Sequence, residues 1–239
     1  MFWRFGGYAN VSTIDTLLEK QDVTIEELLE ESDLIQELKQ QNSKLIEYLR
    51  NEEVLERLLG YVIAPRSIAV QEDDSQSDAS SEKTKGPLNS FFGRTRARSG
   101  SKSLSGDDEG DEGKEEKQRL KYAYTSCEIL SSEVWSISEA LLENHDSLRK
   151  FWEYIKDPVP LEPVQAGYFT KVNEALLDRK TEEMLEFFKS IDNVVAEMLK
   201  HVDCPVIMDL LLKIISLERS EGGQGIVDVG FSPYPQDFH

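Results

Sequence analysis

The sequence predicts an all-α protein made of short stacked helices, in the manner of HEAT or armadillo repeats. Apolar residues recur at three- and four-residue spacing through most of the 239-residue chain, which places them on single helix faces. Two proline-led segments also echo each other at a constant offset close to the 40 to 47 residues of such repeats, whose units bury their apolar faces only by stacking. The corresponding residues are Pro163, Val164, Phe169, Lys171 and Val172 in the first segment and Pro205, Val206, Leu211, Lys213 and Ile214 in the second.

The region from Ile14 to Val62 reads as a series of short helices with polar starts. Thr24 and Glu27 form a predicted capping box, in which the hydroxyl accepts the third helical amide and the carboxylate reaches back to the amide of the cap residue. The candidate N-caps are Thr24, Ser32, Asn42 and Asn51, each just before a new apolar period. Helices this short are marginal alone, so we expect tertiary stacking to hold them.

The first five residues, MFWRF, are apolar, but glycines and Asn10 soon follow, so we expect neither a secretory core nor a membrane span here. Two interpretations of the aromatic residues stay open. Phe2, Trp3 and Phe5 fit a hydrophobic staple against the first helices. Alternatively, Phe2 and Trp3 belong to a docking peptide for a partner, since aromatic residues are enriched at binding hot spots.

Composition divides the chain into helical repeats at 1–69, a disordered insert at 70–118, further helical repeats at 119–219 and an irregular tail at 220–239. The insert is rich in Ser, Asp, Glu, Gly and Lys and has few aliphatic residues, so it cannot bury enough surface to offset chain entropy. The tail contains glycines and prolines that disfavour a helix.

A basic island in the insert supplies two phosphorylation candidates. Ser99 follows Arg94, Arg96 and Arg98 at the spacing that basophilic kinases commonly recognise, and Ser105 precedes acidic residues as in an acidophilic site. A charge-balanced solvated loop is the competing interpretation. A nuclear-localisation signal in the same arginines is a weaker one.

The second helical region begins with a segment through Leu130 and continues as helices broken by prolines. Pro163 and Pro205 are expected at first helical positions, where the missing N–H would have no helical partner. The helix after Pro205 is apolar nearly all round, with Asp209 and Lys213 as an i,i+4 pair, so we expect it within the stack. In the helix near residue 135, the inward residues are predicted to be Val134, Trp135, Ile137, Leu141 and Leu142.

Charge and cysteine usage exclude some functions. A net charge of -19 argues against nucleic acid as a partner, because nucleic-acid affinity depends on clustered Lys and Arg. The two cysteines, Cys127 and Cys204, are embedded in apolar helical sequence, which fits a reducing compartment. We therefore expect a cytoplasmic protein, with the nucleus as a second location, and neither nucleic acid nor membrane among its partners.

No pattern of catalytic residues is present. The histidines lie far apart, and the sequence has no H-E-x-x-H pair, phosphate-binding glycine loop, G-x-S-x-G elbow or C-x-x-C pair. His201 and Cys204 could share a metal, but two ligands do not complete a tetrahedral site, and a packing or capping role is favoured. A lowered thiol pKa at Cys204 is a further alternative to simple burial. We predict a protein that is not an enzyme, with no cofactor, metal or catalytic residue.

Several segments of the sequence resemble the SAPS-domain proteins, which are regulatory subunits of the protein phosphatase 6 class of Ser/Thr phosphatases. The acidic insert gives the resemblance a fungal character. The segments that carry it are MFWRF at the start, IDTLLE from Ile14, DVT from Asp22, QNSKLIE from Gln41, SCEIL from Ser126, YFTKV from Tyr168 and IMDLLL from Ile207.

The resemblance implies an all-helical scaffold that binds a phosphatase catalytic subunit, with further scaffold subunits as a second class of partner. It implies roles in cell-cycle progression and nutrient signalling, and it identifies this chain as the N-terminal part of a longer family member. On one concave face of such a scaffold we expect Lys171, Asn173, Asp209 and Lys213 to contact the partner. A general helical adaptor for unrelated partners and a truncated, inactive fragment are the alternatives.

Overall fold

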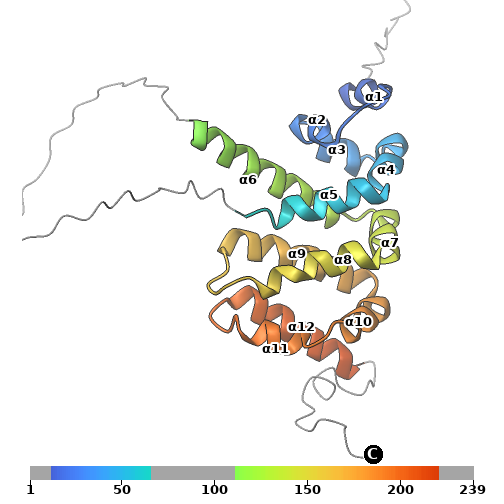
Figure 1. Cartoon of the computed structure of the whole chain (residues 1–239). Coiled ribbons are helices and arrows are strands. Elements are labelled where there is room, and N and C mark those ends of the chain that lie inside the picture. The colour runs from blue at the N-terminus through green and yellow to red at the C-terminus, as the bar shows by residue number, and fades with distance from the viewer. Residues whose placement is uncertain (1–11, 66–110, 221–239) are drawn as a thin grey trace, which may run out of the picture.

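The computed structural model of the chain describes residues 12–65 and 111–220, and every regular element within these ranges is a helix (Figure 1). The all-α prediction is therefore confirmed. Before the gap lie α1 (Thr13–Leu18), α2 (Ile25–Glu30), α3 (Leu34–Lys39), α4 (Ser43–Leu49) and α5 (Glu52–Val62). After it lie α6 (Asp111–Leu130), α7 (Trp135–Glu143), α8 (His145–Trp152), the 3-10 helix η1 (Glu153–Lys156), α9 (Pro163–Arg179), α10 (Thr181–Lys189), α11 (Val194–Leu199) and α12 (Pro205–Ser220).

Side-chain caps start three of the first five helices. The Thr24 hydroxyl accepts the Glu27 amide at 3.4 Å, and Asn51 Oδ1 accepts the Glu53 amide at 2.9 Å. The side chain of Asn42 accepts the amides of Lys44 and Leu45, the second and third of α4, at 3.1 and 3.2 Å. Three of the four predicted caps are thus confirmed, and each satisfies backbone donors that the helix cannot satisfy itself.

The fourth predicted cap, Ser32, is wrong by one residue. Asp33 is the N-cap of α3, and its side chain accepts no backbone amide there. Ser32 instead donates its hydroxyl to Asp33 Oδ1 at 3.1 Å, so the two short polar side chains bond to each other. The proline predictions hold, because α9 begins at Pro163 and α12 at Pro205.

Helix α6 begins at Asp111, eight residues before the predicted second helical region at 119. The residues 111–118 are charged, but Glu, Lys and Gln are good helix formers, and such a stretch needs no apolar face where a helix projects into solvent. Arg119 secures the point where α6 meets the first block. Its guanidinium donates to Glu116 at 2.8 and 2.9 Å and to the Ala64 carbonyl at 2.8 Å, just beyond the end of α5.

Successive helix pairs form the body of the molecule. Figure 1 shows α5 with α6, then α8 with α9, then α11 with α12, following one another along the stack. Helix α9 packs against both α6 and α12, so these three helices lie side by side in that order. This arrangement is stacked as expected, but membership in the HEAT or armadillo class stays a prediction.

The two blocks on either side of the gap share one continuous hydrophobic core. In the first block its buried residues are mainly leucines of α2 to α5. In the second block it includes an aromatic cluster around Trp152, whose ring centroid lies 5.0 Å from that of Phe169 and 4.8 Å from that of Phe188. None of the described helices has the combination of length and hydropathy that a bilayer crossing demands.

Candidate partner-binding face

The predicted partner-binding residues divide into those that reach the surface and those that do not. Lys171 and Asp209 are exposed, and Lys213 is partly exposed. Asn173 is fully buried, so its prediction as an exposed contact is wrong. The other predicted functional residues, Phe2, Trp3, Ser99 and Ser105, lie outside the described residues.

Asn173 is buried because the core needs its amide. Trp152 Nε1 donates to Asn173 Oδ1 at 2.9 Å, and Asn173 Nδ2 donates to the Phe169 carbonyl at 2.9 Å. A buried indole N–H usually requires an acceptor, and this asparagine supplies one among aromatic side chains. The Asn173 amide is therefore used for hydrogen bonds within the core and is not available to a partner.

The two lysines at corresponding positions, Lys171 and Lys213, each form an ion pair with a neighbouring helix of the stack. Lys171 on α9 forms an ion pair with Glu128 on α6, and Lys213 Nζ on α12 lies 2.7 Å from Asp178 Oδ1 on α9. Lys213 thus pairs across helices, and the predicted i,i+4 pair with Asp209 is not formed. Burial opposes the charge of Lys171, but the hydrogen bond that it donates to the Glu128 carboxylate holds its pKa above the ordinary value.

A cavity of about 480 Å³ lies beside the Lys171–Glu128 pair, between α3, the α6–α7 turn and α9. Ser132 contributes a hydroxyl that is buried and has no hydrogen-bond partner. Lys39 and Glu133 line the same cavity and are exposed. The cavity therefore presents side chains of both charge signs to a polar group of a partner, whereas the Ser132 hydroxyl is shielded from solvent.

Two exposed aromatic residues flank, in the sequence, the part of the cavity lining that runs from Glu128 to Val134. Tyr124 on α6 is 52% exposed, and its ring centroid lies 6.3 Å from that of Tyr168 on α9. Trp135, the first residue of α7, is 54% exposed, with Lys180 Nζ 4.2 Å from its ring centroid. We call Tyr124, Glu128, Trp135, Tyr168 and Lys171 the aromatic face.

Trp135 is exposed, so the prediction that its side chain points inward is wrong. Val134 and Ile137 fill the inward positions of the same turn and are buried, so the large indole at the helix start is left outside, against Lys180. An exposed tryptophan held by a cation is typical of binding hot spots.

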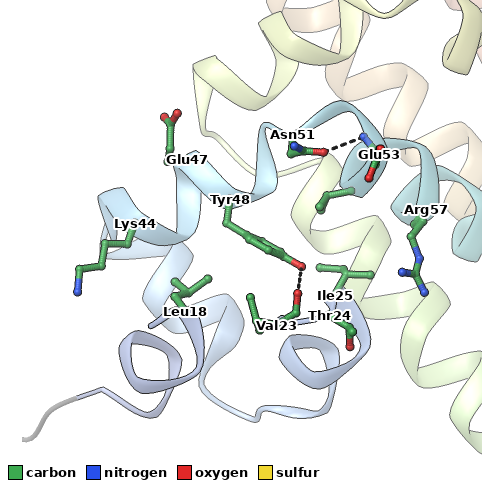
Figure 2. Close-up of a pocket in the computed structure, with 11 residues that line it drawn as sticks. Leu18, Val23, Thr24, Ile25, Lys44, Glu47, Tyr48, Asn51, Glu53 and Arg57 are labelled. Carbon is green, nitrogen blue, oxygen red and sulfur yellow. Dashed lines mark hydrogen bonds between the residues drawn. The ribbon is translucent and has the colours of Figure 1, made fainter. Parts of the chain in front are cut away.

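A second hollow, of about 620 Å³, lies in the first block between α1, the α1–α2 turn, α4 and α5. Figure 2 shows the Tyr48 hydroxyl pointing to the Val23 carbonyl, to which it donates at 3.1 Å. Lys44 and Glu47 point away from the hollow in the same view. The Thr24 hydroxyl, which also lines the hollow, accepts the Glu27 amide. Both hydroxyls are therefore already used within the fold, so the aromatic face is the stronger candidate site.

His201 and the cysteines do not form a reactive site. His201 is buried, and its Nε2 lies 2.7 Å from the Ile155 carbonyl, which confirms a packing role. Burial raises the pKa of the Cys127 thiol to about 11, while Cys204 is only partly buried. In the ranges 12–65 and 111–220 no group of three or more His, Cys, Asp or Glu side chains could hold a metal ion.

Comparison with known proteins shows which sequences this chain is similar to. The family model described as SAPS, SIT4 phosphatase-associated protein, matches residues 173–232. Extragenic suppressor of kinetochore protein 1 of Schizosaccharomyces pombe is 37% identical over 233 residues, which is 95% of this chain and 23% of that protein. SIT4-associating protein SAP190 of Saccharomyces cerevisiae is 42% identical over 115 residues, 48% of this chain and 11% of that protein.

A vertebrate relative covers nearly as much of the chain. Serine/threonine-protein phosphatase 6 regulatory subunit 3 of Gallus gallus is 33% identical over 216 residues, 90% of this chain and 20% of that protein. The chain spans a quarter or less of the length of these relatives. No solved structure matches it. The resemblance to the SAPS family is confirmed.

Proposed function

We propose, from the premise that this is SAPS-family sequence, that the chain is part of a regulatory subunit that binds the catalytic subunit of a protein phosphatase 6-type enzyme and directs its action. The relatives' own names carry this proposal, since they describe SIT4-associating proteins and a phosphatase 6 regulatory subunit. The chain performs no chemistry itself. The reaction belongs to the metal site of the bound catalytic subunit, and cytoplasm and nucleus are the proposed locations.

The aromatic face supports this function physically. Exposed aromatic side chains supply most of the energy at protein interfaces, and Tyr124 and Trp135 are each about half exposed on rigid helices. The paired side chains of Lys171 and Glu128 are 48% and 24% exposed and are therefore already partly desolvated. A partner docking here therefore buries apolar rings without first having to order long charged side chains.

Binding of the 239-residue chain to purified catalytic subunits tests the proposal. At physiological salt, we expect the protein phosphatase 6-type subunit to be retained and the type 2A subunit, the control, to be lost. Retention of both or of neither would contradict selective regulation. Unrelated proteins co-purifying in their place would favour the general adaptor.

Point variants test the assignment of the aromatic face. We expect Trp135→Ala to weaken phosphatase binding at least tenfold, because loss of a hot-spot tryptophan costs about 2 kcal/mol or more. Val202→Ser, at a 72% exposed apolar position on the α11–α12 turn, is the matched control and should leave binding unchanged. Equal effects of the two variants on binding would show that the aromatic face is not the phosphatase-binding site. The proposed regulatory role itself would not be tested by that result.

A further inference from the structure

Helices α6 and α9 lie side by side, and two points of contact set their register. At one end, Arg119 of α6 and Gln165 of α9 both donate to the Ala64 carbonyl. Further toward the C-terminal end of each helix, Lys171 of α9 forms an ion pair with Glu128 of α6. The two helices therefore run in the same direction, and the residues between these points lie beside one another.

Apolar side chains are exposed along the edge that the two helices share. Tyr124 of α6 is 52% exposed, and Val164 of α9 is 43% exposed. Tyr168 is partly exposed beside Tyr124, with 6.3 Å between the two ring centroids. Gly167 and Tyr168 follow Val164 by three and four residues, so the three share one side of α9. We call Tyr124, Val164, Gly167 and Tyr168 the α6–α9 patch.

Gly167 leaves open space over this patch. It lies well inside the 17-residue helix α9, where glycine is among the least favourable residues. A Cβ atom at this position would meet no atom within 4 Å, so no contact among the described residues requires a glycine there. Gly60 on α5 has equally open surroundings, but the residues one turn before it are the charged Glu56 and Arg57. Of these two positions, Gly167 is the one beside exposed apolar side chains, where a second chain has room to approach closely.

The charge beside the patch is opposite to that of the whole chain. The outer side of α6 carries three exposed lysines, one tyrosine and one glutamate at spacings of three and four residues, namely Lys114, Lys117, Lys121, Tyr124 and Glu128. Lys121 pairs with Glu30 of α2, and Glu128 pairs with Lys171 of α9. A chain with a net charge of -19 therefore has a local surplus of positive charge along this side of α6.

We infer that the α6–α9 patch binds an acidic peptide segment of a partner protein. An apolar side chain of that segment lies over Gly167, between Tyr124 and Val164, and its carboxylates meet Lys171 and the lysines of α6. Charge complementarity selects this occupant, because a basic or neutral segment would leave the surplus of lysines without a counter-charge. The phenol hydroxyls of the patch add donors that carboxylates accept. The inference rests on the proposed function for the identity of the partner, since Tyr124, Tyr168 and Lys171 also belong to the aromatic face.

Fluorescence anisotropy with the 239-residue chain and a labelled peptide tests the inference at physiological salt. The probe is a short peptide in which one phenylalanine is flanked on each side by aspartates. We expect saturable binding although the chain as a whole repels the probe, because charges further away than about 8 Å are largely screened at this salt. Replacing the phenylalanine of the probe by alanine should weaken binding about tenfold or more, because the buried apolar area is lost.

Two pairs of variants place the probe on the patch. Gly167→Gln should weaken binding about fivefold or more, because the added side chain fills the space over α9. Gly60→Gln is the matched control and should leave binding unchanged, while both variants raise the Tm by removing a glycine from a helix interior. Lys121→Gln should weaken binding about threefold. Lys150→Gln, which breaks a similar pair between α8 and Glu56 of α5, should leave binding unchanged.

Absence of binding by the aspartate probe would overturn the inference, and so would equal effects of Gly167→Gln and Gly60→Gln. The assay contains no phosphatase, so it separates this inference from the proposed function. Retention of the catalytic subunit without binding of the probe would contradict the inference alone. Binding of the probe at the patch without retention of the subunit would contradict the proposed function alone.

Discussion

The first block, residues 12–65, and the later helices α8 to α12 are stabilised in different ways. The first block consists of helices of 6 to 11 residues, three of them started by side-chain caps, over a core of leucines. The later block contains α9 and α12, of 17 and 16 residues, around Trp152 and several buried polar groups, among them Asn173 and His201. Many small local contributions thus hold the first block, and a few large side chains hold the second.

One stack of helices can therefore combine short capped helices with longer helices that pack around large side chains. A six-residue helix cannot form alone, because its nucleation cost exceeds what its few hydrogen bonds return, so each cap matters. A longer helix contributes more buried area per residue ordered and can tolerate polar groups within its core when each has a partner. The two blocks meet at α6, which packs against α5 and α9.

The largest expected loss of stability comes from a substitution in the later block, α8 to α12. Trp152→Ala should lower the free energy of unfolding by about 5 kcal/mol, since it opens a cavity beside the rings of Phe169 and Phe188 and leaves the Asn173 amide oxygen without its donor. Leu28→Ala, at a fully buried position of α2, should cost about 3 kcal/mol. Urea denaturation of the full chain measures both.

Trp152→Phe separates the two parts of that loss. It keeps an aromatic ring but removes the indole N–H, so we expect a cost of about 2 kcal/mol. If Leu28→Ala proved more costly than Trp152→Ala, the contrast between the blocks would be wrong.

The second effect concerns the junction and depends on pH. Burial raises the pKa of Cys127 from 9.0 to about 11, so the unfolded chain loses this proton at lower pH than the folded one. Stability is therefore fully present below pH 9 and falls as pH rises toward 11, by about 2 kcal/mol for this thiol. Urea unfolding at pH 8 and pH 10.8 measures the fall.

Cys127→Ala is the reference for this measurement. It should lose less stability over the same interval, and what remains comes from groups such as Tyr154, whose pKa burial also raises. An identical fall in both proteins would show that the thiol is not the responsible group.

The third effect belongs to the first block. Asn42→Ala should cost about 1.5 kcal/mol, because its side chain accepts two amides of α4 and donates to Asp15 Oδ1 and Glu37 Oε2, each at 3.1 Å. Asp33→Ala, at an N-cap whose side chain accepts no amide, should cost less than about 0.5 kcal/mol. Thermal unfolding of both variants tests the role of capping, which equal losses would refute.

The smallest expected effect is that of a surface ion pair. Lys20 and Glu27 lie 3.4 Å apart with about half of each side chain exposed, so solvent screens the attraction. Lys20→Met should change the free energy of unfolding by less than about 0.5 kcal/mol, and 1 M salt should remove the difference. A larger change that persists in 1 M salt would show that this ion pair stabilises the first block as strongly as its helix caps do.

The surface could be predicted less well than the helices. The caps at Thr24, Asn42 and Asn51 follow from local sequence, since a short polar side chain reaches the amides of its own helix. The burial of Asn173 and the exposure of Trp135 could not be predicted, because each depends on a neighbour far along the chain. Trp152 lies 21 positions from Asn173, and Lys180 approaches Trp135 from α9.

The all-helical class, the starts of α9 and α12 at prolines and the SAPS resemblance could all be predicted from the sequence alone. These depend on spacing along the chain and on backbone chemistry within a few residues. Only the tertiary structure decided that Lys213 pairs with Asp178 instead of Asp209, and which sides of α9 and α12 are covered. Helical periodicity fixes which residues share a face, but the stacking of one layer on the next decides whether that face is buried.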